Sequence, residues 1–191
     1  MSTQPISPAA LTITPLPAGT WEVDPVHSSV EFQVKHLGIS TVKGQFKEFE
    51  GTLESGPEGV LARGTVQTAS VDTREPQRDE HLRSADFFEV ERFPQIDFRS
   101  SEISTTGEDE FEIHGELTIH GITRPVTLQA TLEGVELSDH QGNTRVGISA
   151  TGQINRSDFE MRFNAALGSG NVVVGDKVKI LVEISAVKQE D

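Results

Sequence analysis

Long runs of alternating apolar and polar residues are the feature that most constrains how this chain folds. In residues 111–119 every odd position except Gly115 is a large apolar residue, and every even position is polar. The same period of two recurs in residues 30–36, 126–132 and 178–186. Because successive side chains of a β-strand point to opposite faces, this pattern predicts long strands with one apolar and one polar face.

Less regular segments complete the set of strands. Residues 42–53, 60–72, 95–105 and 143–155 bring the total to about eight strands. The apolar parity switches at Lys47-Glu48, which predicts a bulge that bends the strand. The turn-forming segments between strands are short, so neighbouring strands should be antiparallel. The prediction is an all-β fold.

Two architectures accommodate such strands, a closed barrel and a sandwich. A sandwich needs two well-filled inner faces, yet only 35% of the residues are hydrophobic. Small residues also occupy positions of inward parity: Gly44, Gly115, Ala130, Ala150 and Gly152. Small inward residues leave room, and a barrel of about eight strands can hold one ligand. A single antiparallel eight-stranded barrel is therefore favoured, although glycines in strands also mark bends.

Charge and composition exclude several classes of partner and site. Thirty acidic residues against sixteen basic ones give a net charge of −14, which repels nucleic acid and anionic bilayers. The chain has no cysteine, which excludes disulfides, thiol nucleophiles and cysteine-based zinc sites. No apolar run approaches the roughly 18 residues of a membrane span, so stable membrane insertion is not expected.

The first residues differ from the rest in composition. Residues 1–19 contain four prolines and no Lys or Arg, which predicts a flexible or loosely docked arm. They lack the basic start and apolar core of a secretory signal, so a cytoplasmic location is expected. Residues 20–191 are long enough for one domain with a full-sized core.

A charged and aromatic stretch, residues 78–94, interrupts the strand pattern. It holds three phenylalanines within seven residues, after Asp79 and His81. Asp79 and His81 could supply a general base and an orienting carboxylate. No nucleophile or metal-binding motif accompanies them, and acids near a helix start complement the helix dipole. The stretch is therefore predicted to form a short helix near residues 78–90 that caps the barrel.

Three further histidines and a late loop are candidate binding groups. His114 and His120 lie on the polar parity, roughly 20 Å apart along one strand, and are expected at the surface without a shared metal. His36 lies on apolar parity, where it is either a hydrogen-bonded core residue or a ligand contact. Residues 155–164 mix Arg with Phe and Met, which suits an amphipathic ligand at a barrel mouth as well as plain packing.

Several motifs in order resemble the YceI-like, polyisoprenoid-binding family, over about residues 21–187. They are WEVDPVHSSVEF (21–32), VKGQF (42–46), FEG (49–51), RDEHL (78–82), DFF (86–88), FP (93–94), GELTIHG (115–121) and INRSDF (154–159). The resemblance implies a lipocalin-like barrel that binds a long isoprenoid or similar lipid in its lumen. The chain departs from it in showing no secretory signal. It also has Glu160 where family members usually have Gly.

These observations lead to one main hypothesis and two alternatives. We expect a non-catalytic protein that binds, and carries or stores, a polyisoprenoid, quinone or acyl-chain lipid, with no cofactor and with homodimerisation plausible. The expected ligand-binding residues are Phe32, Val34, His36, Phe46, Phe98, Phe111, Ile113 and Leu117 in the wall, Phe87, Phe88 and Met161 at the closure, and Arg78 and Arg156 at the headgroup. The alternatives are an enzyme that acts on an isoprenoid or polyketide-like substrate through Asp79 and His81, and an interaction domain that uses its outer face.

Overall fold

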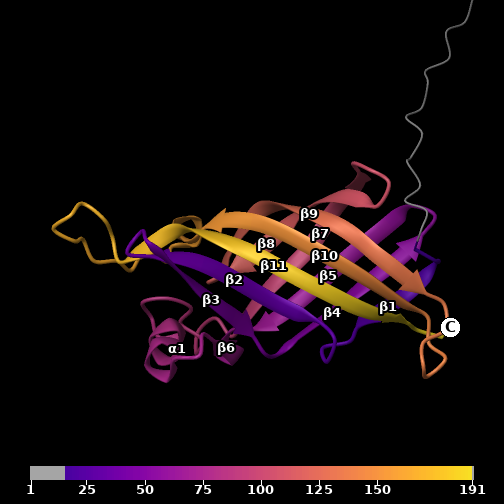
Figure 1. Ribbon diagram of the computed structural model, residues 1–191, viewed down its shortest axis with the longest axis horizontal. Coiled ribbons are helices and arrows are strands. Elements are labelled where there is room, and N and C mark those ends of the chain that lie inside the picture. Colours follow the sequence, from indigo (N-terminus) through magenta and orange to yellow (C-terminus); the bar gives the residue numbers. More distant parts are fainter. Residues whose placement is uncertain (1–15, 191) are drawn as a thin grey trace, which may run out of the picture.

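The structure, a computed structural model, describes residues 16–190 and is built almost entirely of antiparallel strands, with one short helix outside one end of the sheet (Figure 1). The strands are β1 (Gly19–Val23), β2 (Ser29–His36), β3 (Ser40–Phe46), β4 (Phe49–Gly56), β5 (Gly59–Gln67), β6 (Val71–Asp72), β7 (Gln95–Thr105), β8 (Glu110–Ile119), β9 (Ile122–Glu136), β10 (Arg145–Asn155) and β11 (Val174–Lys188). The helix is α1 (Pro76–Arg83), and two 3-10 turns lie at Thr68–Ser70 and Arg156–Phe159. The all-β prediction is confirmed.

The strands close into a barrel of eight positions. Neighbours pair in the order β1-β4-β5-β7-β8-β9-β10-β11, and β11 pairs back with β1 to complete the ring. β2 continues β1 after a break and also pairs with β11, while β3 precedes β4 and pairs with β2. Closure leaves no unpaired edge along most of the sheet. The predicted barrel, and not the sandwich, is therefore the architecture.

The predicted bend at Lys47-Glu48 is present. β3 ends at Phe46 and β4 begins at Phe49, so the two residues between them leave the ladder. Their backbone N–H groups instead donate to Ser70, from Lys47 to its carbonyl at 3.2 Å and from Glu48 to its Oγ at 3.0 Å. The bend allows one long strand to serve two neighbours, β2 through β3 and β1 through β4.

The connection between β8 and β9 is tighter than the sequence pattern indicates. His120 and Gly121 form the whole turn, with φ of 54° and 72°, and β9 starts at Ile122. The prediction that His120 is a surface residue is wrong, since its side chain is only 14% exposed. The left-handed turn directs its ring onto Phe93, with 4.5 Å between ring centroids.

The helix differs from the predicted range in its bounds. α1 begins at residue 76, two residues earlier than the predicted start at 78. It ends at residue 83, seven residues earlier than the predicted end at 90. Glu75 caps its start by accepting from the backbone N–H of Arg78 at 2.7 Å, and a proline occupies the first helical position. The extended backbone of Ser84 ends the helix, and hydrogen-bonded turns lead on to β7.

The termini of the described chain lie at the barrel end opposite α1 (Figure 1). Most of the predicted N-terminal arm, residues 1–19, lies outside the described residues. Its described part is docked, because the Leu16 carbonyl accepts from Ser55 Oγ at 3.1 Å and the Pro17 carbonyl from Trp21 Nε1 at 3.2 Å. Trp21 is fully buried and anchors the small core cluster that fills this end, together with Leu53, Val146 and Ala186.

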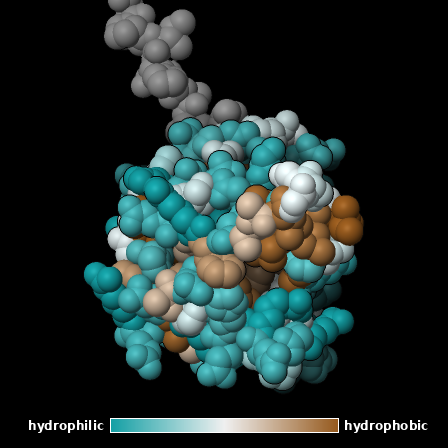
Figure 2. Space-filling view, turned by 90° about the vertical axis from the view of Figure 1, so that its left-hand side faces the viewer, coloured by the Kyte–Doolittle hydropathy of each residue, from teal (hydrophilic) through white to brown (hydrophobic). Residues whose placement is uncertain are grey.

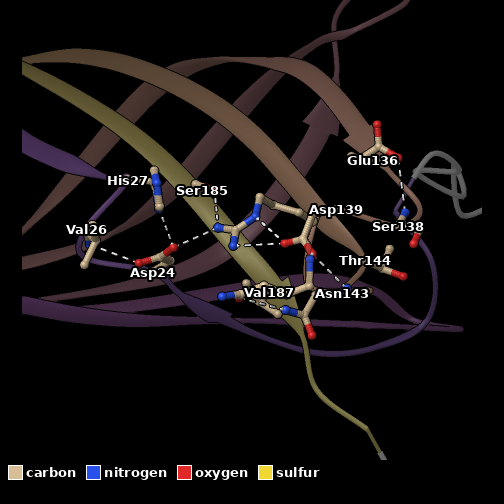
Figure 3. A network of polar contacts seen from close by, with 12 residues as sticks. Asp24, Val26, His27, Glu136, Ser138, Asp139, Asn143, Thr144, Ser185 and Val187 are labelled. Carbon is tan, nitrogen blue, oxygen red and sulfur yellow. Dashed lines mark hydrogen bonds and ion pairs between the residues drawn. The ribbon is translucent and has the colours of Figure 1, made fainter.

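An ionic network braces the same end (Figure 3). Asp24 Oδ2 lies 2.7 Å from His27 Nδ1 and accepts from Arg145 Nη1 at 2.8 Å. Arg145 also donates to Ser185 Oγ at 2.9 Å and pairs with Asp139 at 3.2 Å. The network joins the β1–β2 connection to the β9–β10 connection and β11. The hydrogen bond with His27, followed by that with Arg145, lowers the pKa of Asp24 to about 2.

We expect Asp24→Asn to lower the free energy of unfolding by about 1–2 kcal/mol at neutral pH. The folded pKa, about 2, lies below the ordinary value of 3.8, so the carboxylate stabilises the fold above that value. Its contribution is lost as the pH falls from about 4 toward 2. Urea unfolding of both proteins across this range should show the difference shrinking, and a difference independent of pH would contradict the assignment.

Candidate functional site

A single large cavity of about 670 Å³ occupies the barrel lumen. Its lining runs from Leu16 and Leu53 at the end near the chain termini to His81 and Phe163 at the end beside α1. The space-filling view of that second end shows a hollow bordered by apolar side chains (Figure 2). We call this opening the mouth. Ligand sites commonly have volumes of about 300–1,000 Å³, so the lumen is large enough for one lipid-sized molecule.

All thirteen residues expected to contact a ligand line this cavity. They are Phe32, Val34, His36, Phe46, Arg78, Phe87, Phe88, Phe98, Phe111, Ile113, Leu117, Met161 and Arg156. The wall residues follow from the two-residue period of the strands, because a side chain on the inward face of a closed barrel points into the lumen. Many wall side chains, Phe32 and Ile113 among them, are only half-buried because they border open space. Contact of these residues with a ligand stays a prediction.

The inward glycines Gly44 and Gly115 are predicted from the sequence to leave open space in the lumen, but aromatic rings occupy the space above them. A Cβ on Gly44 would lie 2.3 Å from the ring of Phe32, and a Cβ on Gly115 would lie 2.7 Å from the ring of Phe98. Each aromatic ring therefore occupies the space above a glycine of the neighbouring strand. Both rings lie against the wall in this way, and the open volume is the lumen itself.

Aromatic side chains gather at the mouth. His81 packs edge-on against Phe87 and Phe163, with ring centroids 5.0 and 4.8 Å apart, and Phe46 packs edge-on against Phe88 at 5.6 Å. The sequence interpretation placed Phe163 in the mixed loop of residues 155–164 but did not select it. An aromatic residue close to Met161 in the same loop is the sequence feature that would have identified Phe163 as part of the mouth. Phe93, which the sequence groups with Phe87, packs against His120 instead.

Arg156 holds the loop that follows β10. The residue is 6% exposed, and its guanidinium donates to three backbone carbonyls: Nε to Gly175 at 2.9 Å, Nη1 to Met161 at 2.8 Å and Nη2 to Val174 at 3.2 Å. Burial lowers the pKa of Arg156, although an arginine stays charged in proteins. Arg156 borders the cavity while three of its donors are used to tie the loop to the start of β11, so its main effect is to fix the shape of the mouth.

The two residues proposed for the enzymatic alternative have separate partners. The buried carboxylate of Asp79 accepts from the N–H and the hydroxyl of Thr73, at 2.8 and 2.5 Å. Arg78 donates to the same threonine through Nε at 2.7 Å and Nη2 at 2.8 Å. His81 Nε2 instead lies 2.8 Å from Asp86 Oδ2, just beyond the end of the helix. Asp79 therefore fastens the start of the helix and does not orient His81.

Glu160, where the resembled family usually has Gly, has a left-handed backbone. Its φ is 58° and it ends the 3-10 turn Arg156–Phe159, with its N–H bonded to Ser157 at 3.0 Å. A residue with a Cβ is strained in this region by about 1–2 kcal/mol, whereas glycine is not. The family's usual glycine therefore suits a structural requirement of the turn.

We expect Glu160→Gly to raise the free energy of unfolding by about 0.5–1 kcal/mol, since relief of strain exceeds the entropy cost of glycine. The Glu160 side chain is exposed, so its removal should sacrifice little packing. Thermal and urea unfolding of the two proteins would measure the gain. Glu160→Ala, which keeps the Cβ, is the matched control and should show no such gain.

Residues 16–190 contain neither a cluster of metal-binding side chains nor a membrane-spanning helix. In this part of the chain no three His, Asp or Glu side chains gather as a metal site. No helix of the same residues is long and apolar enough to cross a bilayer.

Comparisons with known proteins agree with this geometry. A YceI-like domain model matches residues 21–186. "Protein YceI" of Salmonella arizonae is 38% identical over 167 residues, which cover 86% of this chain and 83% of that protein. The crystal structure of Campylobacter jejuni YCEI protein superposes with a TM-score of 0.70 at 30% identity, covering 82% of this chain and 90% of that one.

A more distant structure shares the fold at low identity. It is a polyisoprenoid binding domain from Saccharophagus degradans, which superposes with a TM-score of 0.69 at 14% identity. The match covers 88% of this chain and 98% of that domain. The family resemblance of the sequence motifs is thus confirmed by the domain match, by sequence identity and by fold. The chain belongs to the YceI-like family.

Proposed function

We propose that this protein binds one long-chain amphipathic lipid in its lumen, a polyisoprenoid, an isoprenoid quinone or an acyl lipid, and carries or stores it unchanged. The observation that supports this most is the apolar-lined cavity of about 670 Å³, open at the mouth. Family membership and the similar fold of a polyisoprenoid binding domain add support.

The free energy of binding would come from burying the hydrocarbon chain. Each buried CH₂ contributes about 0.8 kcal/mol before the costs of ordering the chain. The lining offers aromatic and branched aliphatic side chains over the whole length of the lumen. A flexible chain with few polar groups therefore fits better than a compact polar metabolite.

The polar end of such a lipid would lie at the mouth. His81, Arg78 and Arg156 border the cavity there, while Leu16 and Leu53 border its other end. The tail would then point toward the buried Trp21 cluster. A role without catalysis is supported by the separate partners of Asp79 and His81. Homodimerisation and the cytoplasmic location stay predictions.

The test is to identify what the purified protein holds and what it takes up. Solvent extraction followed by mass spectrometry should release a lipid with a long hydrocarbon chain. Delipidated protein should then bind a polyprenol, a quinone or a long-chain fatty acid at about one molecule per chain. Protein that contains no lipid and takes up none of these ligands would overturn the proposal.

A further inference from the structure

The mouth has a protruding lip, formed by residues 37–39 between β2 and β3 and residues 164–173 before β11. Both segments extend beyond the barrel at the end where α1 lies (Figure 1). They are tied together, because the Leu37 N–H donates to the Val173 carbonyl at 3.0 Å. Within the longer segment, the Leu167 N–H donates to the Asn171 carbonyl at 2.8 Å. The lip is therefore an extension of the barrel wall that is held together by backbone hydrogen bonds.

The lip exposes apolar side chains next to the lumen. Ile39 is 79% exposed and Val172 is 42% exposed, although both are large hydrophobic residues. Their near neighbours along the chain, His36 and Val173, line the cavity. In the view of this end, apolar surface continues from the hollow outward over one side of the mouth (Figure 2). A ligand that entered the lumen would pass directly from this surface to the cavity.

The charge of the lip and its flanking strands is opposite to that of the whole molecule. Residues 32–46 and 161–175 contain no Asp or Glu, in a chain that has thirty of them. They carry Lys35, Lys43 and Arg162, all exposed. Three basic and no acidic residues give these segments a formal charge of +3, with histidine neutral, against −14 for the chain. Such a charge distribution would favour approach to an anionic surface with the lip first.

We propose that the lip docks reversibly on the surface of an anionic phospholipid bilayer and places the mouth against the membrane. This inference rests on the proposed function, since a lumen that holds lipid needs a source or a destination for it. Exposed apolar tips beside basic side chains suit the headgroup region, where both apolar burial and attraction to anionic lipids contribute, although exposed Glu31, Glu160 and Asp176 border these segments. The net charge of −14 argues against such a partner, but the +3 charge of residues 32–46 and 161–175 reverses that argument locally, at the lip.

The experiment is co-sedimentation of the full-length protein with phosphatidylcholine vesicles that contain phosphatidylglycerol, at low and at high salt. We expect wild-type protein to bind at low salt and to dissociate at high salt. Ile39→Ser/Val172→Ser should weaken binding roughly tenfold, because both apolar tips are lost. Val26→Ser/Leu137→Ser is the matched control, since both residues are highly exposed, at 82% and 71%, outside the lip. It should bind as wild type does.

Further measurements separate this proposal from the proposed function. Lys43→Glu/Arg162→Glu, at two exposed residues outside the cavity lining, should also lose binding to the anionic vesicles, while taking up a polyprenol delivered from solvent as wild type does. Wild-type protein that takes up polyprenol but ignores the vesicles would overturn the docking alone. Vesicle binding without any lipid uptake would support the docking and overturn the function of the lumen. If the lip variant abolishes only self-association, the lip contacts a second copy and the proposal is wrong.

Discussion

Filling the lumen from its wall should abolish lipid binding while the barrel stays folded. Ile113 on β8 and Val182 on β11 both line the cavity and are half-buried, so a larger side chain at either position has open space in front of it. Two indole rings would displace several CH₂ groups of a bound chain. At about 0.8 kcal/mol each, the loss of three or four such groups weakens binding by about a hundredfold. We therefore expect Ile113→Trp/Val182→Trp to bind at least that much more weakly than wild type.

The matched control places the same side chains on the outside of the same strands. Glu116 and Glu183 are exposed neighbours in β8 and β11, so Glu116→Trp/Glu183→Trp adds equal bulk without entering the lumen. Binding of a radiolabelled polyprenol and the circular dichroism of both variants would be compared. Equal loss of binding in the two variants, or none in either, would show that the chain does not occupy the lumen.

The second large effect is expected at Arg156. Arg156→Met removes a buried guanidinium that serves the carbonyls of Gly175, Met161 and Val174. An unsatisfied buried acceptor costs about 1–3 kcal/mol, and partial hydration of the opened loop recovers some of that cost. We expect the free energy of unfolding to fall by about 2–4 kcal/mol, as measured by urea titration.

Two variants make this prediction specific. Arg156→Lys should restore little of the lost stability, because a single ammonium cannot match the planar fork that reaches three carbonyls. Arg162→Met removes an exposed arginine from the same loop and should change stability by less than about 0.5 kcal/mol. If Arg156→Met were as stable as wild type, Arg156 would be available for a ligand headgroup, as the sequence alone indicated.

The barrel and its wall could be predicted because both depend on a simple period. Inward parity in residues 111–119 and 178–186 identifies the face of each strand, and closure of the sheet turns that face toward a lumen. This is why Phe111, Ile113 and Leu117, which share the inward parity, line the cavity. The parity switch at Lys47-Glu48 predicted the bend for the same reason.

The mouth could not be predicted in the same way, because its contacts join residues whose spacing follows no period. Asp79 bonds to Thr73 before the helix, and His81 meets Asp86 after it. His120 is mostly buried because a left-handed turn redirects its ring onto Phe93. The distribution of charge at the mouth also depends on folding, since the acid-free residues 32–46 and 161–175 are far apart in sequence.

Trp21 offers the most direct test of whether a lipid chain lies along the lumen with its tail at the end that the Trp21 cluster fills. It is the only tryptophan of the chain, and it is fully buried in the core cluster that fills that end. Fatty acids carrying a nitroxide quencher either at the tail or beside the carboxylate would be titrated into delipidated protein. The tail label should quench Trp21 fluorescence strongly and the carboxylate label weakly. Bound lipid that quenches equally from both positions, or from neither, would contradict the claim.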